Sequence, residues 1–225
     1  MTEKPTNTNA IIKRMDTKWL LPIILASMTF LTCALLMFSH EMTADKIKAI
    51  ELANKLTSLK RLIPSEFIDN NLIDDSIDIF EPIQLGHRQK ETLYLGKKNN
   101  SITIMAIPVT ARNGYSGDID LLVGIQIGGK TNGQITAVEI LRHKETPGLG
   151  DLIETKKSDW LQQFPNTSLQ LPLEKQWRVK KDNGVFDQIT AATITPRAVV
   201  AAIKQALLFQ QNFELSTYTN DYPTP

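Results

Sequence analysis

Four consecutive small residues just ahead of an expected helix start, Thr190, Ala191, Ala192 and Thr193, have types and spacing suited to chemistry. Small side chains let a large group approach the backbone closely. A hydroxyl here lies near unpaired N–H groups and the positive end of the helix dipole, which stabilise a phosphate, including one esterified to a threonine. A threonine-rich helix cap without a ligand has the same pattern, so the residues alone leave both interpretations open.

The sequence contains no other arrangement typical of a catalytic site. His40, His87 and His143 are scattered without metal-ligand spacing, and His143 is expected as a surface or turn residue. Nucleophile-elbow, phosphate-loop and dinucleotide-binding motifs do not occur. The single cysteine, Cys33, lies in an apolar segment, so the rest of the chain has no disulfide, thiolate nucleophile or cysteine metal site. A formal net charge of +1 gives no bulk attraction to nucleic acid.

The strands that must position the threonine segment suit an antiparallel meander in an α+β fold. β-Branched, partly alternating residues predict strands near residues 92–95, 102–111, 119–127 and 135–141, separated by turn signals. Residues 70–78 are acidic and indicate a turn region. The fold class is therefore a sheet packed against a few helices.

Three helices are expected beside the sheet. An apolar period near 3.6 predicts one over 43–62. A capping-box pattern at Asp151 predicts another over about 152–164. Thr195 as N-cap and Pro196 as first helical residue predict the last. The residues expected on its apolar face are Val199, Val200, Ile203, Ala206, Leu207 and Phe213.

Residues 19–38 carry no charge and predict a transmembrane helix. At ~1.5 Å per residue this stretch spans ~30 Å, the thickness of a hydrocarbon core. It is longer than a usual signal-peptide core, and no small-x-small cleavage site follows it, so an uncleaved anchor is expected. Lys13, Arg14 and Lys18 crowd its N-terminal side, which favours a cytoplasmic N-terminus and an extracytoplasmic domain.

Two segments resemble the motifs of FMN-binding domains. Residues 187–193, DQITAAT, look like the signature D-x-x-[ST]-G-A-T, and residues 143–150, HKETPGLG, look like the motif H-x-E-T-P-G-L-G. With its early anchor, the chain is similar over nearly its whole length to the G subunit of the Rnf (Rsx) electron transport complex. One departure is Ala191 in place of the usual glycine, which matters if the position needs a positive φ angle.

The resemblance implies FMN carried through a phosphoester to Thr193, placed there by a flavin transferase that uses FAD and magnesium and releases AMP. No catalytic residue and no metal site is implied. Tyr115, Trp177 and Phe186 could stack on the ring, although core or rim positions are the more common role of such residues. The other residues implied to line the cofactor or to be read by the transferase are Asp187, Thr190, Ala191, Ala192, Glu145, Thr146, Gly148 and Leu149.

The function implied is an electron relay between redox centres in a membrane complex that couples electron transfer to ion translocation. Its partners would be the other subunits of that complex, the transferase and membrane lipid, with no nucleic acid. The main domain would be periplasmic on a single-pass inner-membrane anchor with a cytoplasmic N-terminus. The chain would then divide into a cytoplasmic tail, the anchor, a helical linker region of the periplasmic domain, the FMN-binding domain and a C-terminal tail, at residues 1–18, 19–38, 39–90, 91–215 and 216–225.

Two alternatives remain open at this point. The first is the C subunit of the sodium-translocating NADH:quinone reductase, which carries the same covalent cofactor in another assembly. The second is a membrane-tethered assembly domain without a cofactor, in which Thr193 is only a helix-start residue.

Overall fold

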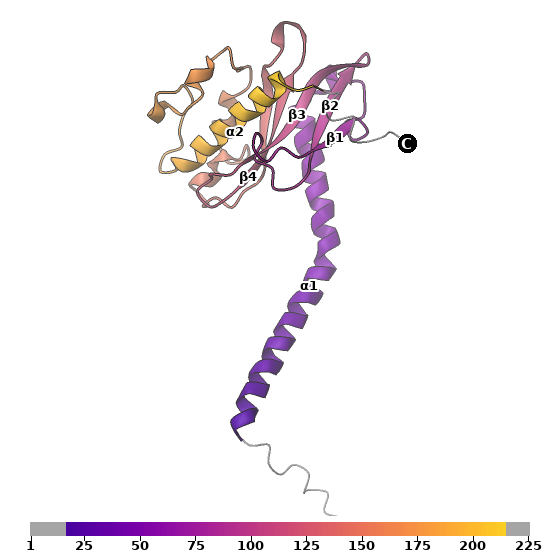
Figure 1. Cartoon of the computed structure of the whole chain (residues 1–225), viewed down its shortest axis with the longest axis vertical. Coiled ribbons are helices and arrows are strands. Elements are labelled where there is room, and N and C mark those ends of the chain that lie inside the picture. The colour runs from indigo at the N-terminus through magenta and orange to yellow at the C-terminus, as the bar shows by residue number, and fades with distance from the viewer. Residues whose placement is uncertain (1–16, 215–225) are drawn as a thin grey trace, which may run out of the picture. The chain divides into compact units, whose positions relative to one another are not determined.

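The computed structural model of the protein describes residues 17–214, and the chain divides into two compact units, Met1–Ala53 and Asn54–Pro225. The first unit contains most of one long helix. The second contains a five-stranded sheet and the remaining helices (Figure 1). Both sequence motifs lie in the second unit, which therefore builds the candidate site.

One continuous helix, α1 (Thr17–Leu62), takes the place of the two helices expected over 19–38 and 43–62. Residues 39–42 include no proline or glycine, so nothing interrupts the backbone hydrogen bonds between the two stretches. Within α1, Leu20–Ile47 is long and apolar enough to cross a membrane, and its most apolar window has no buried residue. By length and composition this part of α1 fits the expected anchor.

The sheet is an antiparallel meander in the order β1-β2-β3-β4-β5, as the strand pattern predicts. The edge strand β1 begins within the stretch 70–78 that indicates a turn region and ends one residue beyond it. It forms because Ile77 pairs with Leu93 of β2, while Ile79 is buried in the core. The strands are β1 (Ser76–Ile79), β2 (Glu91–Lys98), β3 (Ser101–Ala111), β4 (Ile119–Gln126) and β5 (Ile135–Arg142).

Each face of the sheet has its own apolar core. On one face α2 (Ile194–Gln211) lies across β3 and β4 (Figure 1) and buries Val199 and Ile203. On the other face the last turn of α1 contributes Leu59 and Leu62, followed by Ile63. The sheet is therefore covered on both faces, which keeps the loops at its ends in fixed places.

The start of α2 differs from the expectation by two residues. Thr193 occupies the N-cap position, so the expected N-cap at Thr195 is wrong. The Thr195 hydroxyl donates instead to the carboxylate of Glu145, 2.6 Å away. Pro196 is not the first helical residue but lies within the first turn, where N–H groups have no intrahelical acceptor. The expected apolar face is confirmed, because Val199, Val200, Ile203, Ala206 and Leu207 are buried and Phe213 packs against the same core.

The helix expected over 152–164 does not form. Two short 3-10 helices, η4 (Gly150–Ile153) and η5 (Trp160–Gln163), occupy its place. Between them the Ser158 hydroxyl donates to the Leu152 carbonyl and accepts the Trp160 N–H. Such local side-chain bonds compete with helical ones. The Asp151 carboxylate makes no cap either, since it accepts from Lys157.

Candidate functional site

The two motifs, far apart in the sequence, line one cavity of about 320 Å³. The loop after β5 forms one wall, the turn before α2 and the helix start form another, and the loop between β3 and β4 supplies the third. The residues lining the cavity are Tyr115, Glu145, Thr146, Leu149, Gly150, Ala191, Ala192, Thr193, Ile194 and Thr195.

A tight turn over residues 189–192 delivers Thr193 to the start of α2. The Ala192 N–H donates to the Ile189 carbonyl at 3.1 Å, which closes the turn. Ala191 is the third residue of this turn and has a φ of 65°, the left-handed region that favours glycine. The position where the chain departs from the family signature is thus one that needs a positive φ.

Thr193 is half-buried at the N-terminus of α2, where the first N–H groups of the helix have no intrahelical acceptor. Its hydroxyl makes no capping hydrogen bond, and no partner for it occurs within residues 17–214. The helix dipole favours negative charge at this end. The arrangement therefore offers an uncommitted hydroxyl next to a place suited to a phosphate.

The loop over residues 143–150 is built around the buried carboxylate of Glu145. One carboxylate oxygen accepts the Ser116 N–H at 3.0 Å, and the other accepts the Thr195 hydroxyl at 2.6 Å. A Cβ at Gly150 would lie 2.6 Å from a carboxylate oxygen of Glu145, so only glycine leaves room for this contact. Gly148, with φ 77°, turns the loop without lining the cavity.

His143 ties the same loop to the segment after it. The Glu145 N–H donates to Nδ1 of His143 at 3.0 Å, so in the neutral ring the proton is on Nε2, which faces Glu154 at 2.9 Å. Partial burial raises the pKa of Glu154, but hydrogen bonds from Lys157 and His143 lower it on balance. His143 is a half-buried connector rather than a free surface residue.

Some residues that the resemblance implied lie away from the cavity. Asp187 is exposed and pairs with Lys180, with 2.5 Å between Oδ1 and Nζ. Thr190 is exposed on the turn and does not line the cavity. Of the three aromatic candidates, Tyr115 lines the cavity, while Trp177 and Phe186 are core residues.

Ile194 and Thr195 are two cavity residues that lie outside both sequence motifs. They line the cavity because α2 begins earlier than its capping pattern suggests, which brings its first two residues to the opening. The sequence does contain a signal for Thr195. This residue follows Thr193 by two positions, so the two threonines lie on the same turn at the start of the helix.

A solved structure resembles this chain, and a family model matches the residues that build the site. A crystal structure of Shewanella oneidensis NqrC is similar with a TM-score of 0.41 and 16% identity, over 68% of this chain and 74% of that chain. Residues 114–208, which run from the Tyr115 loop through α2, match the FMN-binding domain family. The chain thus contains an FMN-binding domain of the kind that this family defines.

Two relatives that match most of the chain identify its family more narrowly. The G subunit of the ion-translocating oxidoreductase complex from Shewanella baltica is 38% identical over 87% of this chain and 91% of its own length. The protein of the same name from Haemophilus influenzae strain PittEE is 40% identical over 76% of this chain and 79% of its own length. The chain belongs to the family formed by the G subunits of ion-translocating oxidoreductase complexes.

Proposed function

We propose that this protein is the flavin-carrying, electron-relay subunit of a membrane-bound ion-translocating oxidoreductase complex, with FMN joined through a phosphoester to Thr193. The observation that carries the proposal is the cavity in which the 143–150 and 187–193 motifs meet at an uncommitted threonine hydroxyl. Membership of the G-subunit family supports the same function. The protein itself positions the ring and adjusts its surroundings, while the redox chemistry belongs to the flavin.

The cavity suits a planar apolar ring attached to a phosphate. Three large apolar side chains around it remain exposed: Tyr115 at 69%, Ile194 at 44% and Leu149 at 40%. A cluster of exposed apolar side chains at one cavity is typical of a ligand or partner site. The small Ala191 and Ala192 leave the approach to Thr193 open, and the α2 N-terminus provides the N–H groups for the phosphate.

Attachment would proceed by transfer from FAD. The Thr193 oxygen forms a bond to the phosphorus of the FMN half, the pyrophosphate bond breaks, and AMP leaves with the bridging oxygen while the hydroxyl proton goes to solvent. Esterification lowers the phosphate charge from about −2 towards −1, which a helix N-terminus can hold. The tether also keeps the cofactor from being lost by dissociation and fixes its effective concentration.

The exposed first half of the 187–193 motif suits recognition by the transferase rather than flavin binding. Asp187 and Thr190 lie outside the cavity lining, and their side chains are accessible from solvent. Thr193 itself is only half-buried, so an enzyme can reach its hydroxyl. The proposed roles therefore divide the motif into a part that the transferase reads and a part that lines the flavin.

The apolar part of α1 would anchor the domain in the inner membrane with the N-terminus in the cytoplasm. Lys13, Arg14 and Lys18 precede the span, and cytoplasmic flanks carry an excess of such residues. A single helix offers no ion path, so ion movement would belong to the partner subunits. Protease added outside spheroplasts should digest the domain. Complete protection of the domain while the inner membrane is intact would indicate the opposite orientation.

The attachment is tested by producing the full chain with a flavin transferase and viewing a denaturing gel under ultraviolet light. The wild-type band should fluoresce, and Thr193→Val should be dark because it lacks the oxygen that forms the ester. Thr193→Ser keeps that oxygen and should stay fluorescent. Undiminished fluorescence of Thr193→Val would contradict the site, and a dark wild-type band beside a fluorescent control flavoprotein would favour a cofactor-free assembly domain.

A further inference from the structure

The buried carboxylate of Glu145 is the point where all three walls of the cavity meet. Its side chain belongs to the loop after β5, its Oε1 accepts the backbone N–H of Ser116 at 3.0 Å, and its Oε2 accepts the hydroxyl of Thr195 at 2.6 Å. Glu145 is 5% exposed and Thr195 is 1% exposed. A buried carboxyl group whose two oxygens are both hydrogen-bonded is costly to disturb, so it specifies one arrangement of the groups around it.

The backbone around the carboxylate is shaped to admit it. A Cβ added at Gly114 would lie 2.9 Å from Oε1, and one added at Gly150 would lie 2.6 Å from Oε2 and 3.1 Å from the Thr195 hydroxyl. Both distances to Glu145 oxygens are shorter than a side-chain carbon tolerates. Two glycines, one in the Tyr115 loop and one in the loop that carries Glu145 itself, thus leave space for the same carboxylate.

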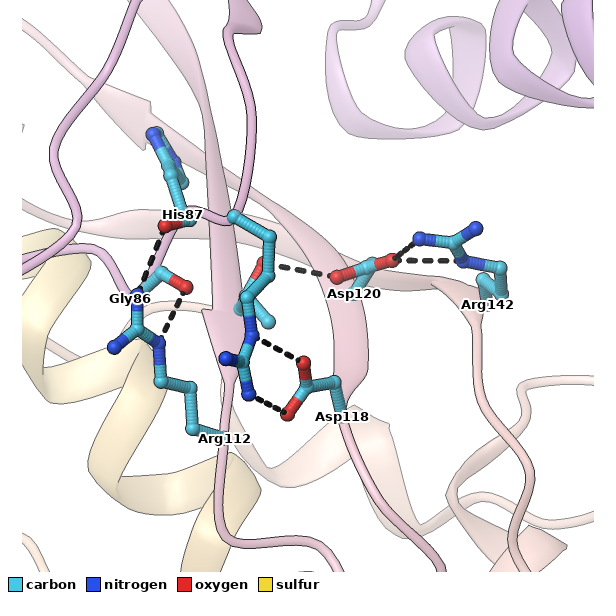
Figure 2. A network of polar contacts seen from close by, with 8 residues as sticks. Gly86, His87, Arg112, Asp118, Asp120 and Arg142 are labelled. Carbon is cyan, nitrogen blue, oxygen red and sulfur yellow. Dashed lines mark hydrogen bonds and ion pairs between the residues drawn. The ribbon is translucent and has the colours of Figure 1, made fainter.

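The loop that supplies Ser116 is itself held at both ends, as Figure 2 shows. At its start, Arg112 donates to the backbone carbonyls of Gly86 and His87 at 2.8 and 2.9 Å. At its end, Asp118 forms a bidentate salt bridge with Arg88, with 2.8 Å between Oδ2 and Nε. Tyr115, whose side chain reaches the cavity, lies between these two attachments.

We infer that Glu145 and Thr195 are positioning residues of the flavin site, a clasp that holds the Tyr115 loop, the 143–150 loop and the start of α2 at fixed separations around the ring. Both carboxylate oxygens are engaged inside the protein, so Glu145 acts through Thr195 and Ser116 rather than by reacting. The clasp determines how far the ring is shielded from solvent. This inference rests on the proposed function, since it concerns the same cavity.

Thr195→Val tests the clasp with little change in shape. Valine fills the space of threonine but leaves Oε2 of Glu145 buried without its donor, which favours opening of the cavity walls. Iodide quenching of the attached flavin, measured on the full chain and expressed per flavin, should rise about twofold as a ring shielded on one face becomes accessible on both. Thr195→Ser restores the hydroxyl and should return the quenching constant to the wild-type value.

A second variant decides the matter if Thr195→Val does not fold. Glu145→Ala removes the acceptor that Ser116 and Thr195 share, so the quenching constant of the folded, flavin-loaded chain should rise above the wild-type value. Wild-type quenching in a folded, flavin-loaded Glu145→Ala chain would show that the joined geometry is not what shields the ring, and would overturn the inference. Wild-type quenching in flavin-loaded Thr195→Val would do the same. Failure of the proposed function is seen separately, as a wild-type chain without flavin.

Discussion

Ala191 occupies a backbone conformation that its own side chain disfavours. Its φ of 65° costs a residue other than glycine ~1–2 kcal/mol relative to the right-handed region. The turn that ends at Ala192 requires it, because the chain must reverse before α2 begins. Alanine is as small as an approaching phosphate requires, but it lacks the backbone freedom of glycine. The departure from the family signature therefore strains the backbone and leaves the room for the phosphate unchanged.

Ala191→Gly is therefore expected to stabilise the domain. Relief of the strained φ should raise the free energy of unfolding by about 0.5 kcal/mol, after subtracting ~1 kcal/mol for the greater freedom of glycine in the unfolded chain. Urea denaturation measures this. Ala192→Gly, at a position without a positive φ, serves as the matched control and should lower the free energy of unfolding by about 0.5–1 kcal/mol. Equal losses from both substitutions would contradict the strain.

Aromatic packing, rather than helical hydrogen bonding, holds the segment between β5 and α2. Phe164 has no exposed surface and lies with its ring centroid 5.3 Å from that of Trp160 and 4.9 Å from that of Phe186. Trp177 joins the same cluster, stacked at 6.5 Å from Phe164. These contacts secure a long irregular stretch that carries Asp187 and the turn before Thr193 at its end.

Phe164→Ala should lower the free energy of unfolding by about 3–5 kcal/mol, because it removes buried surface and leaves a cavity. Phe80→Ala is the control, since Phe80 is 51% exposed beside β1 and should change the free energy of unfolding by no more than about 0.5 kcal/mol. Chemical denaturation of the two variants gives the comparison. A loss at Phe164 no larger than that at Phe80 would show that the aromatic cluster does not hold this segment.

The elements that the sequence predicts best are those with strong periodicity. The strands expected over 102–111, 119–127 and 135–141 and the apolar face of α2 are confirmed. Burial in β3 and β4 is nearly continuous rather than alternating, because the sheet has an apolar core on each face. The pattern does not reveal β1, since only its pairing with β2 makes an acidic stretch extended. It also predicts the wrong structure over 152–164, where aromatic burial and local hydrogen bonds override helix propensity.

The site could be located from the sequence only through its two motifs. Their meeting at one cavity depends on the end of β5 and the start of α2 lying side by side, which no local pattern states. The Glu145–Thr195 contact joins residues 50 positions apart, so it is visible only in the folded chain. This is why the sequence alone indicates a helix cap at Thr195.

At the scale of the whole molecule, surface ion pairs make the domain sensitive to acid. Hydrogen bonds from Lys97, Arg88 and Arg197 lower the pKa values of Asp75, Asp118 and Asp182 respectively. A carboxyl whose pKa is lower in the folded state stabilises the fold above its unfolded pKa and loses that contribution as pH falls through its folded pKa. The stabilisation is thus complete above about pH 5 and declines below about pH 4.

The urea midpoint should therefore be flat between neutral pH and about pH 5 and then fall with further acidification. Asp118→Asn removes one of the groups that must take up a proton and should make the fall shallower. Measuring the midpoint of both chains at several pH values tests this expectation. A midpoint that stays constant or rises between about pH 6 and about pH 3 would contradict it.

The end of α1 belongs to the fold of the domain as well as to the long helix. The side chains of Leu59, Leu62 and Ile63 are buried against the sheet. Truncating any one of them to alanine should lower the free energy of unfolding by about 2–5 kcal/mol. A chain that starts at residue 54 should melt cooperatively in circular dichroism, whereas a chain that starts at residue 64 should not. Identical melting curves for the two would show that this contact is not part of the core.

The proposed attachment of FMN to Thr193 is tested most directly by the mass of one tryptic peptide. The peptide spans residues 182–197 and contains Thr190, Thr193 and Thr195, so fragmentation must localise any added group. Protein from its native membrane should give this peptide with FMN added less one water, on Thr193. The bare peptide, in a membrane where the transferase is present and active, or a flavin on either of the other two threonines, would contradict the assignment.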